Sequence, residues 1–188
     1  MQFSVNNICK SYGSHKVLSN FSYTFDEGLY LLTGVNGCGK STLLKIMSKV
    51  IYPSNTNYTI DKLKVAYLCE KMELVNTNVK VFLKDICKIN KKKMNIKEII
   101  KKWNIPNKNI SNLSKGNKQK VSLIMMILLD CDVYLFDEPT DALDKESIRM
   151  FTEFIKELMN KKIVIITTHE KDYFKDLNYK EVRLECLG

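Results

Sequence analysis

Residues 34–42 read GVNGCGKST, and this segment is the feature that most constrains the fold. A short apolar run, Leu29–Thr33, comes directly before it, and a helical pattern, Lys40–Val50, begins inside it. The order of apolar strand, glycine-rich loop and helix is typical of a backbone that wraps around an anion. The sequence therefore predicts an α/β protein with this loop at the end of a buried parallel strand.

The residue types in this loop suit the phosphates of a nucleotide. Glycines let backbone N–H groups curl around phosphate oxygens, and the following helix directs its positive dipole end at the same anion. Lys40 is expected to bridge the β- and γ-phosphates, and the Ser41 hydroxyl to ligand Mg²⁺. The predicted nucleotide-binding residues of this loop are Gly34, Asn36, Gly37, Cys38, Gly39, Lys40, Ser41 and Thr42.

A second apolar strand, Val133–Phe136, ends in two adjacent carboxylates, Asp137 and Glu138. The carboxyl ends of parallel strands form the ligand-binding edge of such a sheet. Asp137 is therefore predicted to hold Mg²⁺ through water, and Glu138 to face the water that attacks the γ-phosphate. Taken alone, the pair is also compatible with a helix N-cap or a solvated turn.

Apolar runs and helical patterns alternate along the chain, which predicts a largely parallel sheet with helices between its strands. The predicted strands are Phe3–Ile8, Phe21–Phe25, Leu29–Thr33, Leu63–Leu68, Val133–Phe136, Ile163–Thr167 and Val182–Leu184. The predicted helices are Lys40–Val50, Val79–Lys88, Ile96–Trp103, Gly116–Leu129 and Lys145–Asn160. Three continuous apolar runs, Leu29–Thr33, Val133–Phe136 and Ile163–Thr167, are expected to be buried on both faces.

The positive charge is confined to one segment. The chain has a formal net charge of +9, but residues 71–120 contain 14 Lys and three acidic residues, a net of +11. This shift predicts a helical subdomain over 71–120, inserted in a single domain that spans 1–188. Because 28 of the 30 basic residues are Lys, and Lys, Asn and Ile are all abundant, we attribute the charge to composition rather than to a polyanionic partner. Binding to nucleic acid is not expected.

Other functional classes are disfavoured by composition. No apolar run is long enough to span a bilayer, and the N-terminus lacks the pattern of a secretory signal. The six cysteines form no C-x-x-C pair and the only histidines are His15 and His169, so a zinc-type cluster is not predicted. These features predict a cytoplasmic protein.

Further short motifs lie before and after the Asp137–Glu138 pair in the sequence. Upstream of the carboxylate pair lies Leu113-Ser114-Lys115-Gly116-Asn117, which precedes a helix. Downstream lie the segments 139–144 (PTDALD) and 167–169 (TTH). With the glycine loop, these segments resemble the ATPase subunits of ABC transporters in their phosphate loop, signature, Asp-Glu strand, D-loop and switch histidine. The resemblance covers essentially the whole chain.

The resemblance implies a P-loop NTPase core: a mainly parallel sheet with an N-terminal antiparallel part and a small inserted helical subdomain. It also implies ATP and Mg²⁺ as cofactors. Glu138 matches the family's catalytic base, His169 the residue that contacts the γ-phosphate, and Tyr12 the aromatic residue that stacks on adenine. Asp144 matches the D-loop aspartate.

The same resemblance implies a sandwich of two ATP-binding domains. Ser114 and Gly116 of one copy would contact the γ-phosphate bound by the other, and a homodimer is the expected arrangement. Two positions depart from the family. Glu70 stands where the family has a glutamine and is predicted as a further Mg²⁺ ligand, and Lys115 and Asn117 replace a glycine and a glutamine of the signature.

These features predict an ATP-hydrolysing subunit that drives a separate transmembrane permease from the inner face of the membrane. The resemblance implies that the permease contacts residues 70–115. Because the chain ends soon after its last predicted strand, an exporter of peptide, bacteriocin or drug-like cargo is favoured. Two alternatives stay open: a soluble ABC-type ATPase acting on the ribosome or nucleic acid, and a small-molecule kinase.

Overall fold

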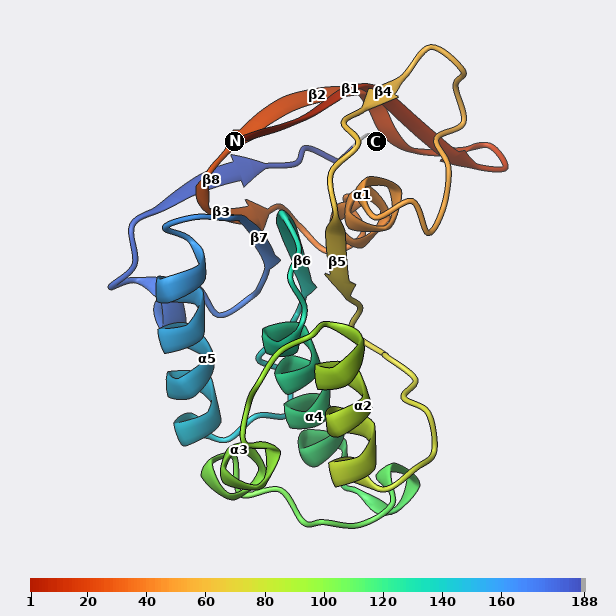
Figure 1. The fold of residues 1–188 in the computed structure, drawn as a ribbon. Coiled ribbons are helices and arrows are strands. Elements are labelled where there is room, and N and C mark those ends of the chain that lie inside the picture. The colour runs from red at the N-terminus through yellow and green to blue at the C-terminus, as the bar shows by residue number, and fades with distance from the viewer. Residues whose placement is uncertain (187–188) are drawn as a thin grey trace.

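The computed structural model describes residues 1–186, and it contains a five-stranded parallel sheet covered on both faces (Figure 1). The order of its strands is β5-β6-β7-β3-β8, and every adjacent pair is parallel. Their bounds are β3 Gly28–Thr33, β5 Val65–Leu68, β6 Val133–Asp137, β7 Ile163–Thr167 and β8 Tyr179–Arg183. The predicted α/β class is confirmed. The three runs expected to be buried on both faces form the central strands β6, β7 and β3, whose residues are buried apart from half-buried Gly28.

The second sheet is antiparallel, with the order β2-β1-β4. Its strands are β1 Gln2–Tyr12, β2 His15–Asp26 and β4 Thr59–Ile60. The sequence did not predict β4, because its two residues carry no periodic signal. Their strand geometry comes from pairing with Val5 and Asn6 of β1.

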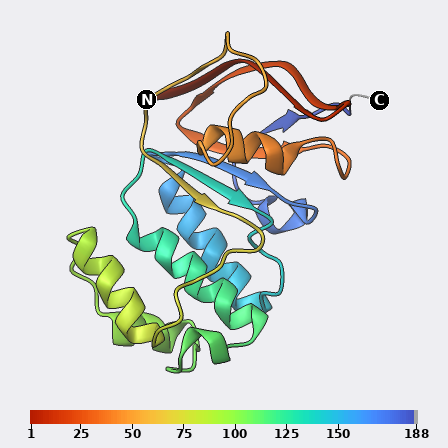
Figure 2. The same cartoon turned by 90° about the vertical axis from the view of Figure 1, so that its right-hand side faces the viewer.

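Two hydrophobic cores lie on opposite faces of the parallel sheet, because alternate residues of each strand point to opposite faces. In β3, Tyr30 and Leu32 join the core formed with α1 and the antiparallel strands, whereas Leu29 and Leu31 join the core formed with α2 to α5. Figure 2 shows the resulting layers: antiparallel sheet, α1, parallel sheet, then α4 and α5. The helices are α1 Lys40–Met47, α2 Val79–Ile89, α3 Ile96–Lys102, α4 Lys115–Leu128 and α5 Lys145–Leu158.

Several element boundaries differ from the sequence prediction. Helix α1 ends at Met47 rather than Val50, because Lys49 adopts a left-handed backbone with φ 60°. Strand β8 covers Tyr179–Arg183 rather than Val182–Leu184. It pairs in register with Leu29–Thr33 of β3, and this pairing, not the apolar pattern, sets its length.

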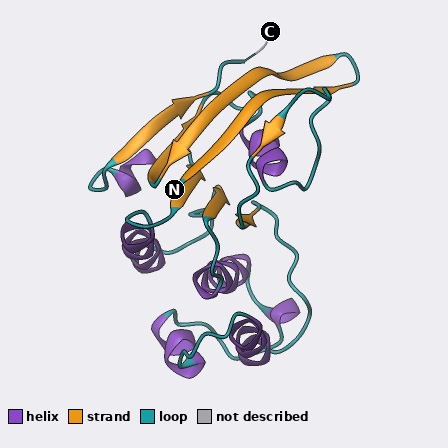
Figure 3. Cartoon of the chain, turned by 45° about the horizontal axis from the view of Figure 1, so that its top comes forward, coloured by secondary structure: helices purple, strands orange, loops and turns teal. Residues whose placement is uncertain are grey.

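Helices α2 and α3 lie at the end of the molecule farthest from the antiparallel strands (Figures 1 and 3). A short 3-10 helix, η1 Ile110–Asn112, connects them to α4, and a second, η2 Lys171–Phe174, follows β7. Helix α4 then runs without a break from this region onto the sheet, where it shares the core with Phe136 and Val164. Within the described residues, no helix has the length and apolar character that a membrane crossing requires.

Candidate functional site

The glycine-rich loop connects β3 to α1, and its conformation depends on glycine at two close approaches. Gly34 and Gly39 have φ values of 143° and 100°, which residues with a side chain rarely adopt. A Cβ atom on Gly39 would lie 2.8 Å from Val17 Cγ1, and one on Gly34 would lie 2.6 Å from the Leu184 carbonyl oxygen. The loop therefore passes so close to Val17 and to the Leu184 carbonyl oxygen that a side chain at Gly39 or Gly34 would clash.

Lys40 holds the loop in shape from the first turn of α1. Its ammonium donates hydrogen bonds to the carbonyl oxygens of Gly34, at 2.8 Å, and Val35, at 3.2 Å. Cys38 is buried against Gly34, so its side chain faces the core. Any contact of Cys38 with a phosphate in this conformation would therefore come from its backbone.

A cavity of about 350 Å³ opens over this loop. Nine of the predicted site residues line it: Asn36, Gly37, Gly39, Lys40, Ser41, Thr42, Glu70, Glu138 and His169. Val17 of β2 also lines the cavity and was not predicted. Tyr12 does not belong to the lining. It ends β1 with 53% of its surface exposed, and the Lys10 ammonium lies 5.3 Å from its ring centre.

Asp137 is buried at the end of β6 and is surrounded by hydroxyl groups. Its Oδ1 accepts hydrogen bonds from Thr167 Oγ1 at 2.7 Å and Ser41 Oγ at 3.0 Å, and its Oδ2 accepts one from Tyr67 at 3.2 Å. The strand order explains this set, because β5 and β7 flank β6 and Thr167 is the register partner of Asp137. The structure thus brings together the two predicted metal ligands, Ser41 and Asp137.

The oxygen groups in this region fit Mg²⁺, which prefers hard oxygen ligands and retains bound water. A carboxylate 3% exposed and a serine hydroxyl are in direct contact here, on the side of the sheet where the cavity opens. Glu70 lines the same cavity from the turn after β5.

Glu138 and His169 form a pair at the ends of β6 and β7. The Glu138 carboxylate lies 3.3 Å from His169 Nε2 and accepts a hydrogen bond from the His169 backbone N–H at 3.2 Å. Glu138 has a left-handed backbone with φ 47°, which is rare for a residue with a side chain. Burial raises the pKa of the Glu138 carboxyl above its ordinary value, while His169 opposes this rise. A carboxylate of raised pKa beside an imidazole is suited to accept a proton from water.

The predicted signature residues lie outside this cavity. Ser114 caps α4, where its hydroxyl accepts a hydrogen bond from the Asn117 N–H at 3.3 Å. Gly116 packs against the loop after Glu138, and a Cβ there would lie 2.5 Å from the Ala142 carbonyl oxygen. Within one chain, therefore, the structure brings together the glycine loop, the carboxylates and His169, but not Ser114 and Gly116.

A buried lysine links α4 to the loop before α5, and the sequence analysis did not identify it. Lys120 donates hydrogen bonds to Asp144 Oδ2 at 2.6 Å and to the Trp103 carbonyl at 3.3 Å. Asp144 also caps α5 by accepting the Ser147 N–H at 2.8 Å. The hydrogen bond from Lys120 lowers the pKa of Asp144 to about 2.

Tyr67 and Thr167 were also missed as neighbours of Asp137. Each carries a hydroxyl group at or next to the last residue of its predicted strand, Leu63–Leu68 or Ile163–Thr167. That position is the available sequence signal, because parallel strands bring such ends together.

Comparison with known proteins places this chain in a family. The model of a family described as ABC transporter matches residues 18–141. An ABC transporter ATP-binding protein of Methanocaldococcus jannaschii is 32% identical, over 94% of this chain and 71% of its own. A high-affinity zinc uptake system ATP-binding protein, ZnuC of Bacillus subtilis, is 26% identical over 97% of this chain and 90% of its own. A solved structure from Pyrococcus furiosus, described as a candidate ABC transporter ATP-binding protein, superposes with a TM-score of 0.77. It is 24% identical and covers 98% of each chain, and this likeness concerns the fold.

Proposed function

The chain belongs to the ABC transporter family as an ATP-binding subunit, and from that premise we propose that it hydrolyses ATP with the residues gathered around the cavity over the glycine loop. One observation carries this proposal. The loop, the Asp137 carboxylate and the Glu138–His169 pair, which are far apart in the sequence, meet at one edge of the parallel sheet.

In the proposed site, the backbone of residues 34–42 and the start of α1 bind the phosphates. Lys40 turns from the loop carbonyls to the β- and γ-phosphates. Ser41 and Asp137 would hold Mg²⁺, which neutralises phosphate charge when bound, and Tyr67 and Thr167 orient the Asp137 carboxylate. Glu70 is proposed as a further oxygen ligand, because it faces the same cavity.

Glu138 is proposed to accept the proton of the attacking water. Its distance of 3.3 Å from His169 Nε2 lets the imidazole orient the carboxylate and, with nucleotide bound, the γ-phosphate. Tyr12 is proposed to stack on adenine. This role requires the exposed tip of the β1–β2 hairpin to move toward the base, because Tyr12 does not line the cavity.

Ser114 and Gly116 are proposed to complete the site of a second copy. They lie outside the nucleotide cavity of their own chain, so they can serve a nucleotide only across an interface. The start of α4 presents backbone N–H groups suited to an anion. We therefore propose an ATP-dependent homodimer.

The proposed partner of residues 70–115 is a separate transmembrane permease at the inner face of the membrane. Export of peptide, bacteriocin or drug-like cargo is the proposed direction, and it stays a prediction. Relatives whose names state a direction are zinc uptake or zinc import proteins. Transport into inverted vesicles that contain the reconstituted complex would support export, and transport into right-side-out vesicles would contradict it.

The hydrolytic role is tested by two substitutions with separate readouts. Glu138→Gln should lower the ATPase rate about 10²- to 10⁴-fold, the usual contribution of a general base, while calorimetry still shows ATP binding. Lys40→Ala should weaken ATP binding about 10- to 100-fold, because it removes a charged hydrogen-bond donor. An unchanged rate in Glu138→Gln would contradict the assigned base.

The same assay separates the alternatives. A kinase would transfer the phosphoryl group to an acceptor, so free phosphate would not appear in step with ADP. A factor acting on the ribosome or nucleic acid would be stimulated by ribosomes or RNA. We expect stoichiometric free phosphate and stimulation by permease-containing membranes instead.

A further inference from the structure

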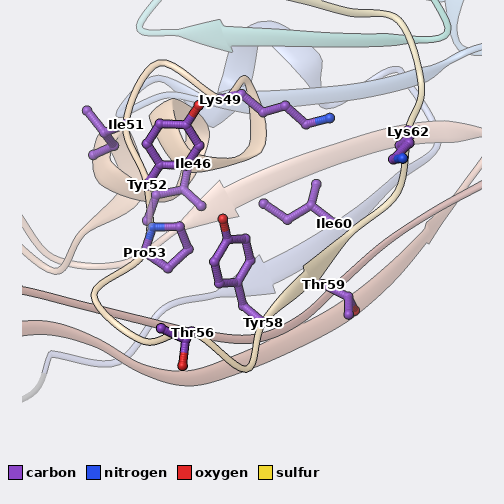
Figure 4. Close-up of a pocket in the computed structure, with 10 residues that line it drawn as sticks. All are labelled: Ile46, Lys49, Ile51, Tyr52, Pro53, Thr56, Tyr58, Thr59, Ile60 and Lys62. Atoms are coloured by element: carbon purple, nitrogen blue, oxygen red, sulfur yellow. The ribbon is translucent and has the colours of Figure 1, made fainter.

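A second cavity, of about 420 Å³, lies at the opposite end of α1 from the glycine loop (Figure 4). It shares no lining residue with the nucleotide cavity. Its apolar wall is formed mainly by Ile46, Ile51, Tyr52, Pro53, Tyr58 and Ile60. Its only charged lining residues are two lysines, Lys49 and Lys62. The cavity therefore combines an apolar wall with positive charge.

The apolar wall includes flat surfaces. Figure 4 shows the rings of Tyr52, Pro53 and Tyr58 grouped together, with Lys49 extending above Ile60 and Lys62 lying to the right of Ile60. Tyr52 remains 66% exposed, although its ring lines the cavity. Aromatic faces pack well against another planar ring, in offset or edge-to-face geometry.

The loop that forms this wall is held against β1 by hydrogen bonds. Lys10 Nζ donates to the Tyr52 carbonyl at 2.7 Å, and the Ser54 N–H donates to the Cys9 carbonyl at 2.8 Å. The Asn55 side-chain amide donates to the Asn7 carbonyl at 2.7 Å. The cavity is therefore already formed, so a ligand would not have to order this loop on binding.

Lys49 occupies a backbone position at which glycine is favoured. It follows the C-cap of α1 with φ 60°, and the Val50 N–H donates to the Lys45 carbonyl at 2.9 Å, as in a Schellman motif. A side chain in this conformation carries a conformational cost that glycine avoids. With lysine rather than glycine at this position, a positively charged side chain lines the cavity.

The two ammonium groups are free to meet an anion. Within residues 1–186, neither Lys49 nor Lys62 forms a salt bridge. The nearest carboxylate in sequence, that of Asp61, accepts a hydrogen bond from the Ser4 N–H at 2.7 Å. An anionic group at this edge of the cavity would gain charge-assisted hydrogen bonds.

We propose that this cavity binds a small aromatic carboxylate, with its ring against Tyr52, Pro53 and Tyr58 and its carboxylate at Lys49 and Lys62. The apolar wall buries the ring of the ligand, and the lysines favour a ligand with a negative charge. This site is independent of the ATP site, because the two cavities lie at opposite ends of α1.

The test uses naphthoate as the probe and isothermal calorimetry on the full chain. We expect saturable binding that Lys49→Gly weakens about ten-fold, because one charged hydrogen bond is lost. Glycine suits the left-handed backbone, so this variant should fold at least as well as the wild type. Lys62→Gln should weaken binding similarly.

Lys91→Gly provides the matched control. Lys91 also follows a helix with a left-handed backbone, φ 52°, and the Lys92 N–H donates to the Cys87 carbonyl at 2.9 Å, as in the Lys49 turn. Lys91 does not line the proposed cavity. The two variants make the same chemical change in similar turns, so only Lys49→Gly should alter naphthoate affinity. Equal loss in both variants would overturn the proposal.

Three further arms define the ligand class. Naphthamide, the neutral analogue, should bind more weakly than naphthoate, and equal affinity would overturn the role of the lysines. Octanoate should bind more weakly as well, and tighter binding of octanoate would overturn the aromatic assignment. Excess ADP should leave naphthoate binding unchanged, and displacement by ADP would place the probe in the nucleotide cavity. Absence of naphthoate binding would reject the site.

Discussion

At the scale of single residues, the contact between Gly116 and Ala142 joins the start of α4 to the loop that follows Glu138. The two segments approach so closely that a Cβ on Gly116 would lie 2.5 Å from the Ala142 carbonyl oxygen. Ala142 itself has a left-handed backbone, φ 62°, which directs this carbonyl. Gly116 is therefore required for packing within its own chain. This requirement is separate from its proposed contact with a nucleotide bound by a second copy.

Gly116→Ala should destabilise the protein by about 1 to 3 kcal/mol, the typical cost of overpacking. The sign of this stability change is informative, because alanine in a helix usually stabilises a protein by about 1 kcal/mol relative to glycine. Urea unfolding of the variant measures the change. Lys115→Ala, at the adjacent position of the same helical turn, serves as control and should change stability by less than about 0.5 kcal/mol. A Gly116→Ala variant as stable as the wild type would contradict this contact.

At the scale of elements, Asp144 connects α4 to α5. Its carboxylate caps α5 and pairs with Lys120, whose side chain is 8% exposed. Because Lys120 also contacts the Trp103 carbonyl at the end of α3, three helices meet at one ammonium group. Loss of the carboxylate would leave a buried cation without its partner.

Asp144→Ala should lower the free energy of unfolding by about 1 to 2 kcal/mol through loss of the cap, with a further contribution from the unpaired Lys120. Asp144→Asn keeps a capping oxygen and should cost less. The pKa of Asp144 is lowered from its ordinary value to about 2, so its contribution is complete above about pH 5 and decreases as pH falls toward 2. Urea unfolding from pH 6 to pH 2 should therefore show a shallower acid loss in Asp144→Asn. Identical pH profiles would contradict the ion pair.

At the scale of the whole molecule, the proposed site is incomplete in one chain. The cavity over the glycine loop is lined by residues of that loop and by the Glu138–His169 pair, whereas Ser114 and Gly116 lie outside it. A second copy can supply these residues across an interface. When hydrolysis is slow, ATP stays bound, and the interface that contains the ATP persists.

Glu138→Gln should therefore form a dimer when ATP and Mg²⁺ are added, measured by light scattering after size exclusion. The measured mass should double when ATP is added, and it should stay at the mass of the monomer when ADP is added. Adding Lys40→Ala to this variant should abolish the dimer, because nucleotide binding is weakened. A chain that binds ATP and remains a monomer would contradict the homodimer and point to a different partner subunit.

The sequence by itself determined the features that depend on neighbouring residues. The loop 34–42, the apolar strands Leu29–Thr33 and Val133–Phe136, and the carboxylates that follow the second strand are all visible as short patterns. Local backbone preferences and alternation fix these features within a few residues. The family and the α/β class follow from their order along the chain.

Only the tertiary structure decided which distant residues meet. Tyr67 and Thr167 contact Asp137 because β5 and β7 flank β6, an order that no local pattern encodes. The cavity beside Lys49 likewise depends on a two-residue strand, β4, that forms through pairing with β1. Such contacts depend on sheet order and on packing across long loops, so the amino-acid pattern of any one segment leaves them undetermined.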